Sequence, residues 1–203
     1  GANVGDCLYE DISGPDGTPD GVIDAYDQTV LGSGLPKVNF GLSTHLEYKG
    51  FDLNISTYGV LNYHVSDDIY NSLNSCYGYG NKEVGMLDAN RWSEDGTYLS
   101  SVPRTYAANN ATLAWNDLFS SRKIQNAAYW KIANVELGYN FPDKWFGGYV
   151  SGVRLYVSAQ NLYTFTGYHG YNVDYAGGTF TPGYNFCSFP SARTFMCGLH
   201  FTF

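Results

Sequence analysis

Five stretches of this chain alternate apolar and polar residues over nine or more positions, which is long for strands of a soluble domain. They cover residues 39–48, 51–61, 129–141, 153–165 and 195–203. Because successive side chains of a strand point to opposite faces, each stretch predicts a β-strand with one apolar and one polar face. Strands of about 9–11 residues have the length that crosses a membrane within a β-barrel.

The connections between these stretches alternate between short and long. Lys49-Gly50 and 142–152 are short, whereas 62–123 and 167–190 are long and rich in Asn, Ser, Tyr and Gly. Outer-membrane barrels have short periplasmic turns and long extracellular loops. In a soluble β-sandwich, the alternative fold, the polar face would be the solvated face. Strand length and loop asymmetry favour the barrel, which five strands are too few to close.

Composition and motifs exclude several function classes. The formal net charge is -8, with 19 Asp and Glu against 11 Lys and Arg, so no basic surface for nucleic acid is expected. No apolar run is long enough for a transmembrane helix. Nucleophile-elbow, P-loop and dinucleotide-binding motifs are absent from the sequence, and the four histidines have no metal-ligand spacing. We therefore expect no catalytic activity.

The four cysteines do not form a C-x-x-C motif, which argues against a zinc or thioredoxin-type site. Cys197 lies within the last alternating stretch, on its apolar face, and is expected to pack as a small hydrophobic residue. Two of Cys7, Cys76 and Cys187 can pair in an oxidising compartment, and the sequence does not say which two.

Residues 16–27, D-G-T-P-D-G-V-I-D-A-Y-D, follow the twelve-residue spacing of an EF-hand-type calcium loop. Gly21 takes the sixth position, where the chain must turn sharply, and calcium is the ion that this spacing predicts. Thr18 and Asp27 depart from the usual ligands, and Asp11 and Ser13 are substitute candidates. The alternative is an acidic turn that binds nothing. The predicted ligands are Asp16, Thr18, Asp20, the Val22 carbonyl, Asp24 and Asp27.

An ordered series of short motifs runs through nearly the whole chain. It comprises Gly5-Asp6, Tyr9, the acidic loop, Leu31-Gly32, Pro36, 41–53, Arg91-Trp92, 126–139, 154–162, Gly170-Tyr171 and the terminal strand. Together these motifs resemble the C-terminal part of the SusC/RagA-type TonB-dependent transporters of Bacteroidetes.

The resemblance implies an all-β fold in which about five long antiparallel strands belong to a 22-stranded, plugged barrel. Residues 1–203 would form its C-terminal segment. An acidic extracellular loop would cover 1–38, a hairpin 39–61, a long extracellular loop 62–123, and the three final strands 124–203, with loop 167–190 among them.

The implied function is import of glycans or peptides across a bacterial outer membrane. The implied partners are the remaining barrel and plug, a SusD-like surface lipoprotein, outer-membrane lipid, and TonB through an N-terminal part that this chain lacks. The C-terminus would lie on the periplasmic side. The competing hypothesis is a soluble secreted calcium-binding β-sandwich that binds carbohydrate.

Aromatic residues are the remaining candidates for a site. In the predicted extracellular loops, aromatic rings suit sugar stacking or protein contact, and packing within the loops is the alternative. The candidates for ligand or lipoprotein contact are Trp92, Tyr98, Trp115, Tyr171 and Tyr175. Trp145, Phe146 and Tyr149 are expected in a periplasmic-side aromatic belt. The resemblance also implies a barrel-assembly signal at the C-terminus, made of Phe195, Leu199, Phe201 and Phe203.

Overall fold

The computed structural model describes residues 4–75, 81–87, 92, 102–104, 113–146, 150–174, 178 and 180–202. The chain divides into two compact units. Unit 1 consists of residues 1–32 and 66–124, and unit 2 of residues 33–65 and 125–203. Within the described ranges, no helix is both long enough and apolar enough to cross a membrane.

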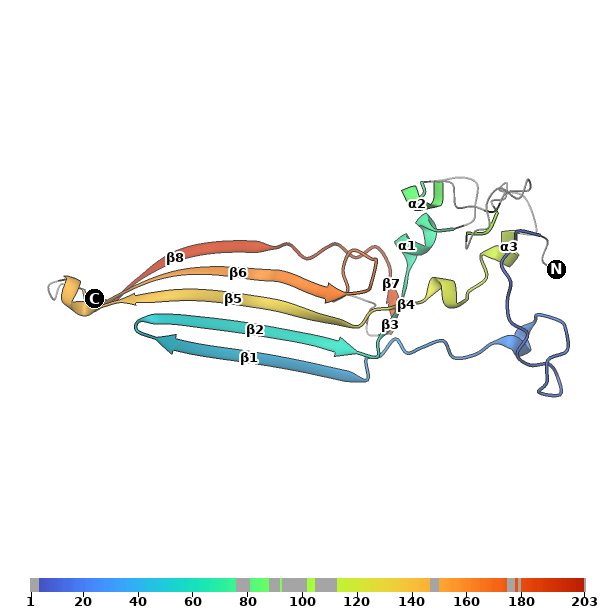
Figure 1. Ribbon diagram of the computed structural model, residues 1–203, viewed down its shortest axis with the longest axis horizontal. Coiled ribbons are helices and arrows are strands. Elements are labelled where there is room, and N and C mark those ends of the chain that lie inside the picture. Colours follow the sequence, from blue (N-terminus) through green and yellow to red (C-terminus); the bar gives the residue numbers. More distant parts are fainter. Residues whose placement is uncertain are drawn as a thin grey trace. The chain divides into compact units, whose positions relative to one another are not determined.

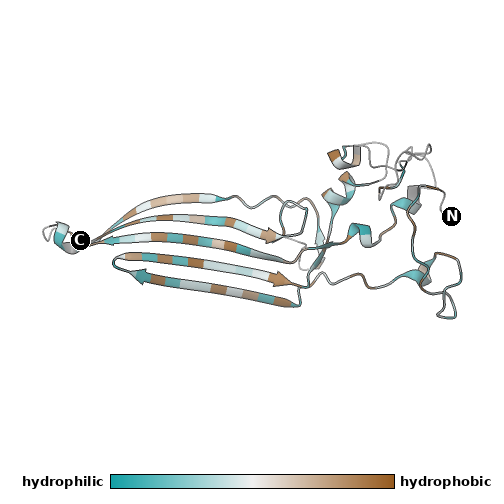
Figure 2. Cartoon of the chain, in the orientation of Figure 1, coloured by the Kyte–Doolittle hydropathy of each residue, from teal (hydrophilic) through white to brown (hydrophobic). Residues whose placement is uncertain are grey.

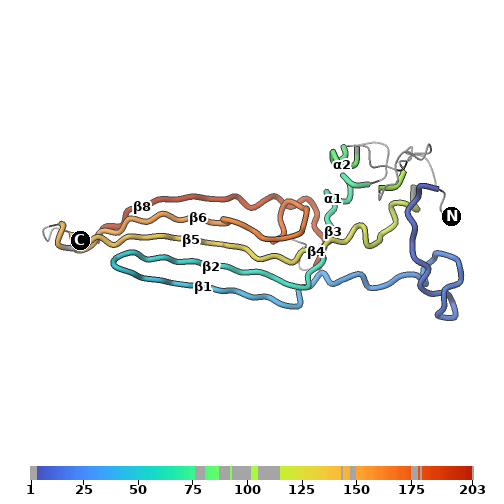
Figure 3. The backbone as a smooth tube through the Cα atoms, in the orientation of Figure 1, coloured from blue at the N-terminus to red at the C-terminus, as the bar shows by residue number. Residues whose placement is uncertain are grey.

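Unit 2 is built on a five-stranded antiparallel sheet (Figure 1). Its strands are β1 (Val38–Tyr48), β2 (Phe51–Leu61), β5 (Tyr129–Phe141), β6 (Gly152–Thr166) and β8 (Thr194–Thr202). The order β1-β2-β5-β6-β8 follows the chain, so each large-sheet strand pairs with the next one along the sequence (Figure 3). This confirms the five predicted strands and their antiparallel arrangement, with bounds that differ by at most one residue.

The tight turn at Lys49-Gly50 sets the register of the first hairpin. Both residues have positive φ, 48° at Lys49 and 90° at Gly50, as a two-residue type I′ turn requires. Tyr48 therefore lies opposite Phe51, and the ladder runs without a shift to the Val38–Leu61 pair. Near the turn the register pairs residues of like polarity, for example Leu46 with Leu53 and His45 with Asn54.

A bulge interrupts β5 and β6 about two-thirds of the way towards the long loops. Ser56 pairs with Asn134 and Thr57 with Ile132, which leaves Ala133 without a partner in β2. β6 accommodates the shift at Asn161, whose φ is 51°. Beyond the bulge, Ile132 and Trp130 continue the apolar face, which the simple alternation in sequence did not indicate.

The main core of unit 2 lies at the end of the sheet opposite the Lys49-Gly50 turn. A small sheet of β3 (His64–Asp67), β4 (Gln125–Asn126) and β7 (Tyr184–Asn185) forms there, in the order β4-β3-β7. The buried cluster consists of Tyr63, Val65, Ala127, Tyr129, Tyr168 and Val173. Asn185, 2 % exposed, donates from Nδ2 to the Tyr168 hydroxyl at 2.8 Å. At the turn end, η3 (Asp143–Phe146) follows β5.

In the described residues of unit 1 the elements are short: η1 (Ala25–Asp27), α1 (Asp68–Leu73), α2 (Val84–Leu87), α3 (Leu113–Asn116) and η2 (Ser121–Lys123). Long-range polar contacts hold it together. The Arg104 side chain donates to the Asp6 carboxylate at 2.9 Å, and the Cys7 backbone N–H donates to Asn116 Oδ1 at 2.6 Å. Two segments predicted as separate loops therefore fold as one body.

Candidate functional site

The first candidate functional surface is the apolar face of the large sheet. The register aligns rows of apolar side chains across all five strands, for example Leu46, Leu53, Leu137, Val157 and Cys197. Figure 2 shows hydrophobic and hydrophilic residues alternating along the strands. The side chains remain largely accessible: Val157 is 50 % exposed, Phe195 68 % and Leu199 58 %. A large and exposed apolar surface of this kind is typical of a face that contacts an apolar partner or a membrane.

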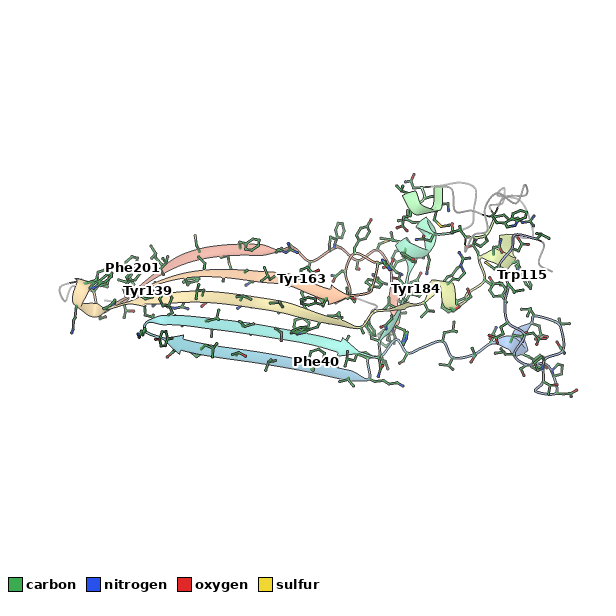
Figure 4. All side chains as sticks on the ribbon, viewed as in Figure 1. Phe40, Trp115, Tyr139, Tyr163, Tyr184 and Phe201 are labelled. Atoms are coloured by element: carbon green, nitrogen blue, oxygen red, sulfur yellow. The ribbon has the colours of Figure 1, made fainter. Side chains whose placement is uncertain are left out.

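Aromatic residues mark both ends of this face. At the long-loop end the rings of Trp130 and Phe165 stack at 5.3 Å. At the turn end Phe141 contacts Tyr139 at 4.9 Å and Trp145 at 5.8 Å between ring centroids. Figure 4 labels Tyr163 towards the first end and Tyr139 and Phe201 towards the second. Aromatic girdles at two levels are typical of barrel strands that cross a bilayer.

The opposite, polar face carries an ion-pair network on three strands. Arg154 of β6 donates from Nη2 to Asp52 Oδ1 at 2.5 Å and to Glu136 Oε1 at 2.7 Å. Its Nε donates to Asp52 Oδ2 at 3.0 Å, and Asn140 Nδ2 donates to the same oxygen at 3.0 Å. Such a two-point contact fixes the direction of the guanidinium as well as its position.

Two glycines provide the space for this network. A Cβ at Gly138 would lie 2.4 Å from Asp52 Oδ2 and 2.6 Å from Arg154 Nη2. A Cβ at Gly198 would lie 2.5 Å from the Tyr156 ring, which is in cation–π contact with Arg154 at 5.2 Å. The side chains of Arg154 and Tyr156 therefore lie over neighbouring strands at positions that have no side chain of their own.

A second ion pair attaches the loop after β6 to the polar face. Lys131 of β5 pairs with Asp174, whose Oδ2 also accepts a hydrogen bond from the Tyr58 hydroxyl at 3.3 Å. Lys131 is 4 % exposed, and the loop residues Tyr168 and Val173 contribute to the adjacent core. The loop is thereby held against the strands by charge and by apolar packing together.

Burial on the two faces is inverted relative to a soluble sheet. The polar face contains the well-buried Asp52 and Lys131, at 5 % and 4 %, while leucines and phenylalanines of the apolar face are far more exposed, for example 42 % at Leu155 and 68 % at Phe195. In the described part of the chain no second sheet packs on that apolar face. A β-sandwich needs such a second sheet, and this observation weighs against the competing hypothesis.

In unit 1, the acidic loop is shaped by its own carboxylates. Asp11 Oδ2 accepts from the Gly21 N–H at 2.6 Å, and Asp24 Oδ1 accepts from the Tyr26 N–H at 2.7 Å. Gly21 has a φ of 82°, which agrees with the sharp turn predicted there. Asp16, Thr18, Asp20 and Val22 are exposed. Among the described residues, no group of three or more His, Cys, Asp or Glu is placed to hold a metal ion; calcium binding stays a prediction.

Asp27 closes this loop. Its Oδ1 accepts from the backbone N–H groups of Ile12 and Ser13, at 2.8 and 3.2 Å, and its Oδ2 from that of Asp24 at 2.8 Å. The bond from Asp24, followed by those from Ser13 and Ile12, lowers the pKa of the Asp27 carboxyl. The twelfth residue of the predicted metal loop thus binds three backbone donors.

We expect acid to open this loop. Since the folded state lowers the pKa of Asp27, its stabilising contribution is present above the ordinary carboxyl value, about 4, and is lost as pH falls through the lowered value. Asp27→Asn should remove it at neutral pH, because one amide oxygen cannot replace two carboxylate oxygens. Amide hydrogen exchange at Ile12, Ser13 and Asp24 should rise several-fold. Unchanged exchange would show that Asp27 does not close the loop.

The aromatic residues predicted to contact a ligand or lipoprotein differ in how closely they pack against the rest of the protein. The Trp115 Nε1 donates to the Cys7 carbonyl at 2.9 Å, and its ring meets that of Tyr9 edge-on at 5.4 Å. Burial raises the pKa of Tyr9 to about 12, so the phenol stays protonated and donates to the Trp115 carbonyl. The Trp92 ring lies against Gly5. These two tryptophans therefore pack within unit 1, whereas Tyr171 in unit 2 is 61 % exposed. A role in ligand or lipoprotein contact stays a prediction.

Several predicted residues lie outside the described residues: Cys76, Tyr98, Tyr149, Tyr175 and Phe203. The described cysteines, Cys7, Cys187 and Cys197, are free. Phe195, Leu199 and Phe201 are exposed on the apolar face of β8, and their role as an assembly signal stays a prediction. The Arg154 network and the attachment of Asp174 were not predicted, because alternation assigns residues to a face but does not pair them.

Comparison with known proteins gives a consistent result, although no family model matches the chain. TonB-dependent receptor P3 of Formosa agariphila is 30% identical over 97% of this chain and 19% of its own length. TonB-dependent receptor SusC of Bacteroides thetaiotaomicron is 26% identical over 90% of this chain and 17% of its own length. The chain thus spans about a fifth of these relatives. They are transporters and not enzymes, in agreement with the expected lack of catalysis.

Solved structures give the same answer for the fold. The RagAB peptide importer in its closed-closed state matches with a TM-score of 0.74 and 24% identity, over 94% of this chain and 20% of that chain. In the open-open state the TM-score is 0.72 with 23% identity. The five-stranded antiparallel sheet therefore has the fold of one part of a much larger transporter chain.

Proposed function

We propose that this chain forms part of the barrel of an outer-membrane importer. It is a distant homologue of the SusC/RagA-type TonB-dependent receptors and corresponds to about a fifth of their length. The apolar face of the large sheet then meets lipid and the polar face lines the barrel interior. The observation that carries this proposal is the inverted burial of the two faces.

The complete barrel has 22 strands in this proposal. The unpaired edges of β1 and β8 join strands from the rest of the protein, because an open edge in lipid leaves backbone groups without partners, at several kcal/mol each. The Lys49-Gly50 turn and the end of β8 face the periplasm. The long connections, including those of unit 1, face outwards, where a SusD-like lipoprotein covers the barrel.

Energy for import comes from TonB in this proposal, through a plug and contact segment in the rest of the protein. The cargo is a peptide or a glycan. The name of the RagAB peptide importer supports the first, and SusC-type relatives leave the second open.

The test is to express the complete protein in a Bacteroidetes host and fractionate its membranes. We expect the protein in the outer membrane, with faster migration on unboiled than on boiled gels, and with uptake that stops when TonB is deleted. A folded, monodisperse protein in detergent-free buffer would contradict the proposal and support the β-sandwich.

The acidic loop is also proposed to bind calcium, with Asp11 as a ligand beside the predicted set. Asp11 Oδ1 is buried without a hydrogen-bond partner, and the Asp11 side chain interacts with that of Asp27. A divalent cation would coordinate Asp11 Oδ1 and would screen the charges of the neighbouring Asp11 and Asp27 carboxylates from each other.

Calorimetric titration of the complete protein with CaCl₂ checks this proposal. We expect binding that Asp11→Asn weakens at least about tenfold, because a charged ligand is lost, and that EDTA reverses. Glu10→Gln, one residue away, is the matched control. Equal titration curves for the wild type and Asp11→Asn would remove the proposed site.

A further inference from the structure

One edge of β6 is open near the long loops. β8 pairs with β6 only from Gly152 to Gln160, whereas β5 pairs with β6 as far as Thr166. In the described ranges no strand occupies the outer edge of residues 161–166. Such an edge presents backbone N–H and C=O groups in a row roughly 17 Å long. It is a template for a further extended chain.

The chain that leads into β8 runs beside this edge without pairing to it. The Asn161 side chain donates from Nδ2 to the Ala192 carbonyl at 2.9 Å, and that of Asn172 to the Phe189 carbonyl at 3.0 Å. The Asn161 side chain thus stands where a backbone bond would continue the ladder, and Asn172, in the loop after β6, binds the segment further on. The segment 189–192 is fixed beside β6 by side-chain amides, and no described strand pairs with the outer backbone edge of residues 161–166.

A pocket of about 310 Å³ lies beside this edge. Its walls include Tyr163, Thr164 and Thr166 of β6, Tyr171 and Asp174 of the following loop, and Arg193 directly before β8. This volume is at the lower end of the range for ligand sites. Aromatic, hydroxyl and charged groups line the same pocket as the strand edge.

The charge of the pocket comes from Arg193. Lys131 also lines it, but Lys131 is neutralised by Asp174. In the part of the chain that the structure describes, Arg193 makes no ion pair. A lone guanidinium beside a strand edge, in a chain with a net charge of -8, suits a carboxylate.

We infer that this pocket binds an extended peptide, whose main chain pairs with the open edge of β6 and whose carboxylate meets Arg193. The inference rests on the proposed importer function and names its substrate class. A peptide repeats donors and acceptors at the spacing of the edge, and strand addition is an established mode of peptide recognition. A glycan has hydroxyl groups without that repeat. The pocket therefore favours peptide over glycan.

The test uses the complete importer in detergent and a hexapeptide of alternating alanine and threonine with a free C-terminus. Two versions carry N-methyl groups on the odd or on the even residues. Because alternate N–H groups of a strand point to the same side, we expect one version to bind at least about tenfold more weakly and the other to keep its affinity.

Arg193 is tested with the same peptide. Amidating its C-terminus should weaken binding roughly 10- to 100-fold in the wild type, as expected for a lost charge-assisted hydrogen bond, and should have no effect in Arg193→Gln. Lys144→Gln removes an equal charge at the other end of the sheet and serves as the control. Migration of unboiled protein reports whether each variant is folded.

The results separate this inference from the proposed function. Equal binding of both N-methylated versions, or binding of maltohexaose but not of the peptide, overturns the inference while TonB-dependent uptake still stands. Loss of outer-membrane location or of TonB dependence overturns the importer itself. If amidation of the peptide still weakens its binding to the Arg193→Gln variant, Arg193 does not contact the peptide carboxylate.

Discussion

Arg154→Ala should be among the most destabilising single substitutions on the polar face, at about 1.5–3 kcal/mol, the range for hydrogen bonds to charged groups, because the Arg154 side chain is 25 % exposed. Among the described residues, the Arg154 guanidinium is the one cation in ion-pair contact with both Asp52 and Glu136. Asp52 is 5 % exposed, so its carboxylate would remain buried with Asn140 as its remaining side-chain donor. We expect the complete barrel to lose heat-modifiable migration at a temperature lower by several degrees.

The controls divide this effect into its parts. Arg154→Lys keeps the charge but loses the two-point contact with Asp52, so an intermediate loss is expected. Asp52→Asn combined with Arg154→Ala removes both partners and should destabilise less than Arg154→Ala alone. If Arg154→Ala melts like the wild type, the pair is solvated and does not hold β2, β5 and β6 together.

The sequence was sufficient to predict the large sheet because its signals are local. Alternation fixes the two faces of each strand, and Lys49-Gly50 fixes the turn and hence the register of the first hairpin. The apolar positions change phase at the bulge, from Trp130 and Ile132 to Ala133 and Val135, but the sequence of β5 alone does not show which residues of β2 and β6 face the extra residue. The sequence of one strand does not contain the information about which residues of a distant strand pair with it.

The candidate site shows the same limit. Alternation places the polar residues Asp52, Glu136 and Arg154 on one face, but their network depends on Gly138, whose missing side chain is informative only once β2 and β6 flank it. Likewise, the EF-hand-type spacing of the acidic loop does not reveal that Asp27 binds the backbone of Ile12 and Ser13. Carboxylates that fit a metal also fit a turn, and only the fold decides between them.

Val157→Arg should block assembly of the barrel in the membrane. Val157 lies in the middle of the apolar face, between Leu137 of β5 and Cys197 of β8, and is 50 % exposed. An arginine facing the centre of a bilayer costs about 2–4 kcal/mol in a barrel strand. We expect a large drop in the fraction of the complete protein that reaches the outer membrane in heat-modifiable form.

Asn134→Arg is the matched control, since it places the same side chain on the polar face, in the row of Ser56 and Gln160. On a water-lined surface the added charge lies near Glu136 and should leave assembly unchanged. If the two variants assemble equally well, the apolar face does not meet lipid. If only Asn134→Arg fails to assemble, the polar face meets lipid and the apolar face lines the interior, so the two faces are assigned the wrong way round.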